Sequence, residues 1–208
     1  MLLGGCHMLF GLDHVDPTDG GAPPCAVFMD IKFDDPTPCE PWGMRDGNAT
    51  MTQGPDRLTI QPILQASYGV CSLNAAVPFT SDGIMVEVEQ VLDSGMGDYT
   101  VLGVGTEIDL QIMAAAGQLL FTNTVGTANY SDIPDLAYSP TAMRWWRMRR
   151  RSATEVIAEY SMDRATWTRL GVHADAHASA YPYVIAGYET ARPTGTSKAV
   201  YRRLIMCN

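Results

Sequence analysis

Residues 142–170 of this sequence read AMRWWRMRRRSATEVIAEYSMDRATWTRL and carry its clearest structural signal. In the first part, residues 142–151, Trp146 and Met148 share one face of a strand pattern. Trp145, Arg147 and Arg149 share the other face. Residues 154–160 alternate in the same way after a short polar break. Successive side chains of a strand point to opposite faces, so we predict two strands joined as an antiparallel hairpin.

The register of this hairpin follows from its apolar side chains. Each strand must turn its apolar set to the same face as its partner's, because a slip of one residue moves the whole set to the other side. We therefore expect Met148 opposite Val156 and Trp146 opposite Ala158. Large Trp146 beside small Ala158 suits a packed interior, so Trp146 should be nearly inaccessible.

The other face of the hairpin should point outward. It carries Trp145, Arg147 and Arg149, which this register sets beside Glu155 and Glu159. Cross-strand pairing with these glutamates explains the arginines and contributes roughly 0.2–1 kcal/mol per pair. The alternative, an anion-binding cluster, needs more assumptions. We expect Trp145 to be at least partly exposed and available to a ligand together with the two arginines.

The same period of two continues through the rest of the chain from residue 25. Strand-length segments are separated by turn signals such as Asp46-Gly47 and Pro193-Thr194-Gly195. Only residues 107–117 compete as a helix, through three consecutive alanines. The other predicted strands are 26–33, 57–64, 69–77, 83–92, 99–104, 107–115, 118–123, 166–173, 181–189 and 197–206. Many short strands at regular spacing predict a sandwich or barrel, and residues 25–208 form one such domain.

Composition narrows the class of protein. The 208 residues are 46% hydrophobic, enough for a sizeable core, and only 18% are charged. The net charge is −9. An acidic chain is a poor partner for phosphate backbones, which need clustered Lys and Arg, so we expect no nucleic-acid partner. No stretch reaches the roughly 18 apolar residues of a transmembrane helix.

The hairpin and the turn after it resemble a known family. The run of arginines and hydrophobic residues, followed by E-x-S, an Asp turn and W-x-x-L, is similar to the concanavalin A-like and laminin G-like sandwiches of bacterial secreted proteins. One departure is Arg164, where glycine usually follows the Asp, so the turn type is expected to differ. The matching residues are Arg144, Trp145, Trp146, Arg147, Met148, Arg149, Glu159, Ser161, Asp163, Trp167 and Leu170.

This resemblance implies an all-β fold, a jelly-roll sandwich of two antiparallel sheets. It implies no single function, because the fold hosts lectins, hydrolases and inert modules alike.

The first 24 residues resemble a targeting motif followed by a flexible linker, or tether. Leu3-Gly4-Gly5-Cys6 resembles the lipobox of bacterial lipoproteins, in which the cysteine is lipidated. Only five residues precede Cys6, too few for the apolar segment of roughly 7–15 residues in a secretory signal. Either the true start lies upstream or the match arises by chance. Residues 13–24 are acidic and rich in Pro and Gly, as in a flexible linker. We expect an outer-membrane or cell-surface lipoprotein whose only membrane contact is the lipid anchor.

Four cysteines remain once Cys6 is set aside, and an exported domain would pair them. The sequence allows three connectivities. Cys25 opens the first predicted strand and Cys207 closes the last, and jelly rolls often place terminal strands side by side. We therefore predict the disulfides Cys25–Cys207 and Cys39–Cys71.

Hydrolysis of glycosidic bonds is the first chemistry to test, because laminarinase-type hydrolases share this fold. They carry E-x-D-x-E or E-x-D-x-x-E on one strand, with one carboxylate as nucleophile and another as acid/base. Here Glu107 and Asp109 begin the motif, but Gln111 or Ile112 stands at its last position. Without that carboxylate the double displacement cannot run, so we expect no catalytic residues and no release of sugar from β-glucans.

Aromatic side chains offer a second possibility, because sugar rings stack their C–H faces on them. Tyr181 and Tyr183 join Trp145, Arg147 and Arg149 as candidate ligand-binding residues. His173 and His177 flank an aspartate in a loop-like H-x-D-x-H segment, but lack further ligands nearby. We expect no metal and no cofactor.

Three functions remain open. The leading one is a non-enzymatic module outside the cytoplasm that binds glycan or another cell-surface polymer, or serves as an envelope structural protein. The second is a glycoside hydrolase or lyase of the laminarinase-like type. The third is a structural protein of a virion or its tail. The oligomeric state does not follow from the sequence.

Overall fold

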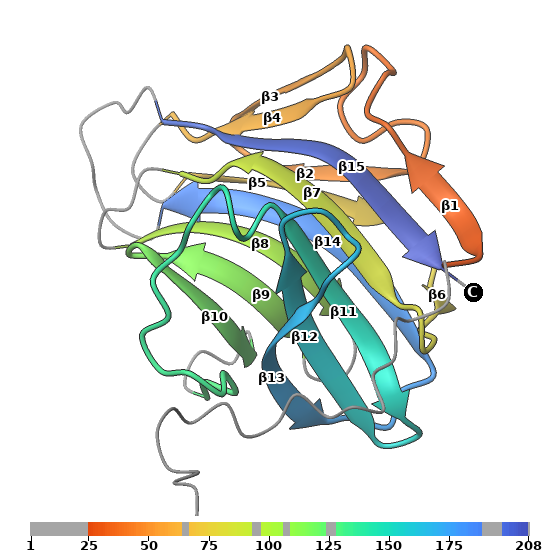
Figure 1. Cartoon of the computed structure of the whole chain (residues 1–208). Helices are drawn as coiled ribbons and strands as arrows, with labels where there is room; N and C mark the ends of the chain where they lie inside the picture. The colour runs from red at the N-terminus through yellow and green to blue at the C-terminus, as the bar shows by residue number, and fades with distance from the viewer. Residues whose placement is uncertain are drawn as a thin grey trace, which may run out of the picture.

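The structure, a computed structural model, describes residues 25–63, 67–92, 97–105, 109–123, 128–188 and 197–207. All regular secondary structure within these ranges is β, arranged as two antiparallel sheets packed face to face (Figure 1). The predicted all-β sandwich is therefore confirmed. Cys6, the tether and Glu107 lie outside the described residues.

The first sheet contains the hairpin that opened the sequence analysis. The terminal strands β1 (Val27–Ile31) and β15 (Ala199–Cys207) pair with each other, and they lie side by side near the C-terminus in Figure 1. The remaining order of this eight-stranded sheet is β13 (Thr168–Ala174), β12 (Glu155–Ser161), β11 (Trp145–Ser152), β7 (Ile84–Gln90), β15 (Ala199–Cys207), β4 (Leu58–Gln61) and β3 (Thr50–Gln53).

The second sheet has seven strands. Its order is β10 (Gln118–Asn123), β9 (Leu110–Ala115), β8 (Asp98–Gly105), β14 (Ser179–Tyr188), β5 (Tyr68–Leu73) and β2 (Gly43–Gly47), with β6 (Val77–Pro78) paired to β14. The segment with helical potential is strand β9, because it pairs with β8 on one side and β10 on the other. The sequence did not predict β2 or β3, which are short and carry few apolar residues.

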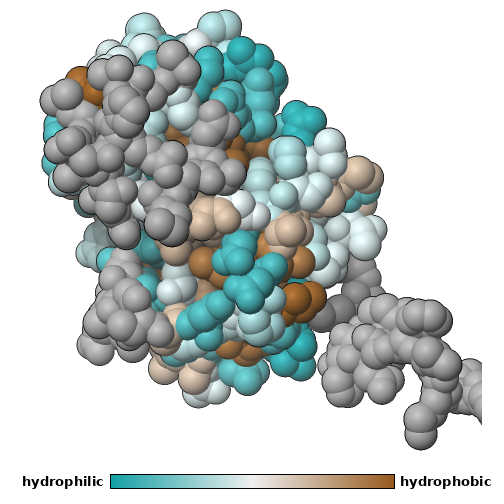
Figure 2. Space-filling view, turned by 90° about the vertical axis from the view of Figure 1, so that its left-hand side faces the viewer, coloured by the Kyte–Doolittle hydropathy of each residue, from teal (hydrophilic) through white to brown (hydrophobic). Residues whose placement is uncertain are grey.

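The core fills the space between the two sheets. Trp146 from β11 and Tyr201 from β15 are among its largest fully buried side chains. The Tyr201 hydroxyl crosses the core and donates to the Ile185 carbonyl of β14 at 2.8 Å. Figure 2 shows the side that faces left in Figure 1, where hydrophilic residues cover most of the described surface and hydrophobic ones form small patches. Most of the buried apolar residues therefore lie between the two sheets.

The register of the central hairpin differs from the prediction. Met148 pairs with Ala158 and Trp146 with Tyr160, two residues from the expected partners. The turn lies at Ala153-Thr154, where Ser152 pairs with Glu155, and a register shift follows in β11 between Arg150 and Ser152. The alternation pattern reveals neither feature. A shift of two residues keeps every side chain on its face, so the division into inner and outer sets survives.

The predicted solvent exposure is correct for one tryptophan of the hairpin and wrong for the other. Trp146 is fully inaccessible, as predicted. Trp145 points outward but is only 7% exposed, so the prediction of an accessible Trp145 is wrong. Two features explain this: the Arg164 guanidinium lies 4.8 Å above the Trp145 ring, and the indole packs with Met85 and Ile205 in a small apolar cluster on the outer face.

Both predicted disulfides are present. Cys25 and Cys207 have Cα atoms 5.5 Å apart, and those of Cys39 and Cys71 are 5.3 Å apart. The first bridge spans a sequence separation of 182 residues and the second one of 32. Closing such loops stabilises a fold by about 4–5 kcal/mol per bridge in the chain-entropy view.

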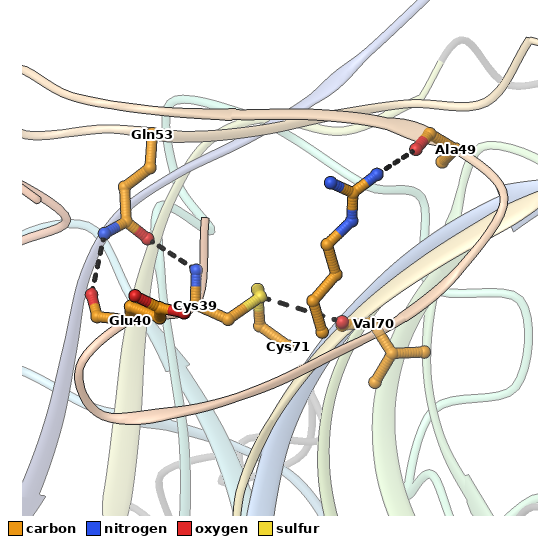
Figure 3. Close-up of a disulfide and its surroundings, with 7 residues drawn as sticks. Cys39, Glu40, Ala49, Gln53, Val70 and Cys71 are labelled. Atoms are coloured by element: carbon orange, nitrogen blue, oxygen red, sulfur yellow. Dashed lines mark hydrogen bonds between the residues drawn. A yellow bond between two sulfur atoms is a disulfide. The ribbon is translucent and has the colours of Figure 1, made fainter. Parts of the chain in front are cut away.

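Side-chain hydrogen bonds hold the Cys39–Cys71 bridge in place (Figure 3). The Gln53 amide from β3 accepts from the Cys39 backbone N–H at 3.0 Å. The same amide donates to the Glu40 carbonyl at 3.1 Å. This residue of the eight-stranded sheet therefore ties down the loop that enters β2 of the other sheet.

Candidate functional site

The predicted ligand-binding residues fall on two opposite surfaces. Trp145, Arg147 and Arg149 lie on β11, on the outer face of the eight-stranded sheet. Tyr181 and Tyr183 lie on β14, on the outer face of the seven-stranded sheet. The structure does not bring the two groups together, so each surface is considered separately.

Tyr183 lies flat on the outer surface of the seven-stranded sheet. Its partner across the ladder is Gly103 of β8, and a Cβ atom at that glycine would lie only 2.0 Å from the Tyr183 Cζ atom. The ring therefore covers the space that a side chain would fill, and its hydroxyl reaches the next strand. There the Gln111 amide of β9 donates to the Tyr183 hydroxyl at 2.8 Å. Burial raises the pKa of the Tyr183 phenol.

A second tyrosine repeats this arrangement in the opposite direction. Tyr99 of β8 pairs with Gly187 of β14, and a Cβ atom at Gly187 would lie 2.5 Å from the Tyr99 hydroxyl oxygen. The Tyr99 ring points toward Tyr68 of β5, whose Cβ lies 2.7 Å from the same position. The two glycines let two aromatic rings lie on the sheet. Glycine inside a strand pattern is the signal that could have indicated this close approach.

The surface is accessible beside these rings. Tyr181 of β14 is 51% exposed, and it pairs with Gly105 at the end of strand β8. The Asp109 carboxylate is close, because a Cβ at Gly105 would lie 3.3 Å from its Oδ1 atom and 3.5 Å from the Tyr181 Cβ. We call this surface, made of Tyr68, Tyr99, Gln111, Tyr181 and Tyr183, the tyrosine face.

Two residues of the hydrolase-like motif, Asp109 and Gln111, lie at the tyrosine face. Asp109 directly precedes β9, and Gln111 is the second residue of that strand. Gln111 is half-buried on the outer side, between fully buried Leu110 and Ile112. In the E-x-D-x-E form of the motif the last carboxylate stands at this position, which here carries the Gln111 amide. An amide carries no proton that it can transfer to a leaving group.

The outer face of the eight-stranded sheet holds a buried ion cluster. Glu159 accepts from the Arg147 Nε at 2.8 Å and from the Arg149 Nε at 2.9 Å. The side chains of Glu159 and Arg147 are 4% and 6% exposed. Burial lowers the pKa of Arg147, and the adjacent Glu159 opposes that effect. The predicted pairing across the hairpin is correct for Glu159, which serves both arginines, and not for Glu155.

The remaining arginines of the run are engaged as well. Arg144 donates to Glu87 of β7 at 2.7 Å. Arg150 donates from Nη1 to the carbonyls of Ala153 and Asp175, at 2.9 and 3.0 Å. These contacts support the reading of the basic run as a structural element, and not as an anion site.

The H-x-D-x-H segment does not converge on one point. His173 stacks on Tyr130 with ring centres 3.9 Å apart. Asp175 instead contacts His177, whose Nδ1 lies 3.0 Å from Asp175 Oδ1. Across the described residues, no group of three or more His, Cys, Asp or Glu side chains is arranged to hold a metal ion.

The turn after β12 places its arginine in a backbone conformation that glycine usually takes. Arg164 has a φ of 66°, the left-handed conformation that favours glycine. The turn is held by Asp163, whose carboxylate accepts from the backbone N–H groups of Ala165 and Thr166. This conformation is reached here without glycine, and the Arg164 side chain contacts the Trp145 ring.

Comparison with known proteins identifies the fold. No protein-family model and no curated protein matches the sequence. Among solved structures, a glycosyl hydrolase family protein from Mycobacterium fortuitum matches with a TM-score of 0.59 and 11% identity, covering 86% of this chain and 98% of its own. An immunostimulatory antigen and pseudo β-1,3-glucanase of Mycobacterium tuberculosis matches with a TM-score of 0.58 and 10% identity, covering 88% and 99%. A legume lectin-like domain from Entamoeba histolytica gives 0.51 and 9%, covering 77% and 87%. At these identities the likeness concerns the fold.

Proposed function

Since the chain is a concanavalin A-like β-sandwich, we propose that it is a glycan-binding module without hydrolase activity, and that its ligand lies on the tyrosine face. The observation that carries this proposal is the geometry around Gln111. An amide occupies the position of the acid/base, and it is bonded to a tyrosine ring that lies flat on the sheet. The structural likeness to a pseudo β-1,3-glucanase and to a legume lectin-like domain supports the proposal.

The chemistry of the tyrosine face suits a sugar chain. Flat aromatic rings offer a surface to the C–H faces of pyranose rings, and half-exposed Tyr181 extends that surface beyond Tyr183. Gln111 and Asp109 supply polar groups at the edge, where sugar hydroxyls would lie. Mainly apolar walls with a few convergent polar groups are the usual make-up of a small-molecule site.

Binding is tested with laminarin, a soluble β-1,3-glucan, by affinity electrophoresis and calorimetry. The wild-type protein should be retarded, and Tyr181→Ala should weaken binding. The matched control is Phe28→Ala, which removes an aromatic ring that is 49% exposed on β1 of the other sheet. Equal affinity in all three proteins would exclude the tyrosine face as the laminarin site.

Absence of turnover is tested in the same preparations. The wild type should release no reducing sugar from laminarin, because the acid that protonates the leaving group is missing. Gln111→Glu restores a carboxylate at that position and is the variant in which activity would first appear. Wild-type turnover that Glu107→Gln abolishes would instead support the hydrolase alternative.

We also propose that the protein is exported and anchored through Cys6. The two disulfides support this, because such bridges form and persist in oxidising compartments. Among the described residues, no helix is both long enough and apolar enough to cross a membrane. Metabolic labelling with a radioactive fatty acid in a bacterial host should label the wild type and leave Cys6→Ala unlabelled.

A further inference from the structure

A hollow of about 370 Å³ lies on the outer face of the eight-stranded sheet, opposite the tyrosine face. Met85 and Ile205 form an apolar wall of this hollow, and the Trp167 indole lies beside them. Asp82 and Arg164 complete the lining at its polar side. The volume falls within the range of small-molecule sites, at its lower end. We call it the back-face hollow.

Asp82 is one of the two carboxylates of this hollow. Its side chain is half-buried, and its charge acts on the Arg147 guanidinium, which lines the same hollow. The turn that carries it is fixed to the end of β15: Cys207 donates to the Gly83 carbonyl at 2.9 Å, and the Thr80 hydroxyl donates to the Cys207 carbonyl at 3.0 Å. These hydrogen bonds hold the carboxylate at the hollow, where its oxygens can accept hydrogen bonds from a ligand.

The aromatic wall is equally well fixed. The Arg147 guanidinium lies 4.0 Å from the centre of the Trp167 ring, and the Trp167 indole N–H donates to the Arg164 carbonyl at 3.0 Å. Arg164 in turn covers Trp145. The hollow thus has a preorganised apolar surface, which reduces the ordering cost of binding.

Charge balance narrows the ligand class. Two arginines and two aspartates line the hollow, so no net charge favours a phosphate or an amine. A ligand that matches these walls is uncharged, has one apolar face, and presents hydroxyl groups to Asp82 and Arg164. A sugar ring has all three properties. From this geometry we propose that the back-face hollow is a second saccharide site, separate from the tyrosine face, that binds a sugar unit of a glycan.

This proposal takes its ligand class from the proposed function, but its site shares no residue with the tyrosine face. A sandwich with saccharide sites on both outer surfaces can hold two chains of a polymer at once. Simultaneous engagement raises the effective affinity for a polymer well above that of either site.

The test is a titration with laminarihexaose and with chitohexaose, read by calorimetry and by tryptophan fluorescence. Fluorescence reports the hollow, because Trp167 lines it, whereas the tyrosine face as defined contains no tryptophan. The wild type should bind at least one of the two probes at two sites. Asp82→Ala should weaken one site about tenfold or more, as expected for loss of a charged acceptor. Trp167→Phe should remove the fluorescence response.

Control variants separate the possible failures. Glu155→Ala removes a carboxylate at the far end of β12 on the same outer face, and it should leave both sites intact. A single wild-type site that Tyr181→Ala removes and Asp82→Ala leaves would overturn the second site and keep the proposed function. A single site that only Asp82→Ala removes would keep the hollow and reject the tyrosine face. If neither probe binds, both the tyrosine face and the back-face hollow are rejected as saccharide sites. If Glu155→Ala and Asp82→Ala weaken binding equally, the back-face hollow is rejected.

Discussion

The two outer faces of this sandwich treat their aromatic rings in different ways. On the tyrosine face, rings lie directly on glycines, as Tyr183 covers Gly103. On the eight-stranded face, guanidinium groups cover the rings, as Arg164 covers Trp145. One face is therefore built to present flat apolar surface. The other is closed by ion pairs except at the back-face hollow.

The largest effect should come from the ion cluster of the eight-stranded face. Glu159→Gln would remove the carboxylate charge that pairs with the buried guanidinium groups of Arg147 and Arg149. Breaking a buried pair in this way costs about 3–5 kcal/mol. We expect a loss of that size in the free energy of unfolding, measured with urea.

An exposed pair on the same sheet provides the control. Asp132 and Arg169 form an ion pair with side chains 35% and 39% exposed. Asp132→Asn should change stability by no more than about 1 kcal/mol, because solvent screens surface pairs. Similar losses in the two variants would mean that the cluster around Glu159 is hydrated, and the contrast between the faces would fail.

The next effect concerns the glycines under the tyrosines. Gly103→Ala places a methyl group where the Tyr183 ring lies, so the ring must move away and lose its bond to Gln111. Overpacking of this kind costs about 1–3 kcal/mol. Gly105→Ala is the matched control in the same strand, because its Cβ would meet nothing closer than 3.3 Å.

A double-mutant cycle sharpens this prediction. In Gly103→Ala combined with Tyr183→Ala, the clash no longer exists, so the two losses should not add. The unfolding free energies of the four proteins give the coupling directly. Additive losses would show that Tyr183 does not lie on Gly103, and the platform of the tyrosine face would be lost with it.

A third effect appears at alkaline pH. Burial raises the pKa of Tyr183 above its value near 10 in the unfolded chain. The stability linked to its neutral form is complete below about pH 10 and is lost as the pH rises toward the folded pKa. Tyr183→Phe should therefore lose less stability between about pH 9 and pH 11 than the wild type. If stability falls equally with pH in the wild type and in Tyr183→Phe, the Tyr183 hydroxyl lies in solvent.

Much of this fold could be predicted from the period of two alone. That pattern identified the hairpin and the inner position of Trp146, because burial on one face leaves a direct trace in the sequence. The position of the turn and the register shift in β11 leave no such trace, so the predicted register is wrong by two residues. Strand β2 was missed for the same reason, since its GMRDG sequence has no apolar alternation.

The candidate site was less predictable than the fold. Tyr183 was found because aromatic residues are obvious candidates, but its role depends on Gly103 from another strand. Such pairings are set by sheet order, which short-range patterns do not contain. The same limit explains why Trp145 and Tyr183 were grouped as one site. They belong to different sheets, and alternation gives a side chain's face without saying which sheet it is in.

The smallest effect on stability, and the sharpest test of the cover over Trp145, is Arg164→Gly. Arginine at a φ of 66° costs about 1 kcal/mol relative to glycine, while its stacking on Trp145 returns about 0.5–1 kcal/mol. The two contributions nearly cancel, so the free energy of unfolding should change by less than about 1 kcal/mol. The exposure of Trp145 should change far more, because the guanidinium is the group above its ring. Acrylamide should therefore quench tryptophan fluorescence more strongly in Arg164→Gly than in the wild type. Equal quenching with unchanged stability would mean that Met85 and Ile205 alone bury Trp145, and that the eight-stranded face does not depend on guanidinium cover.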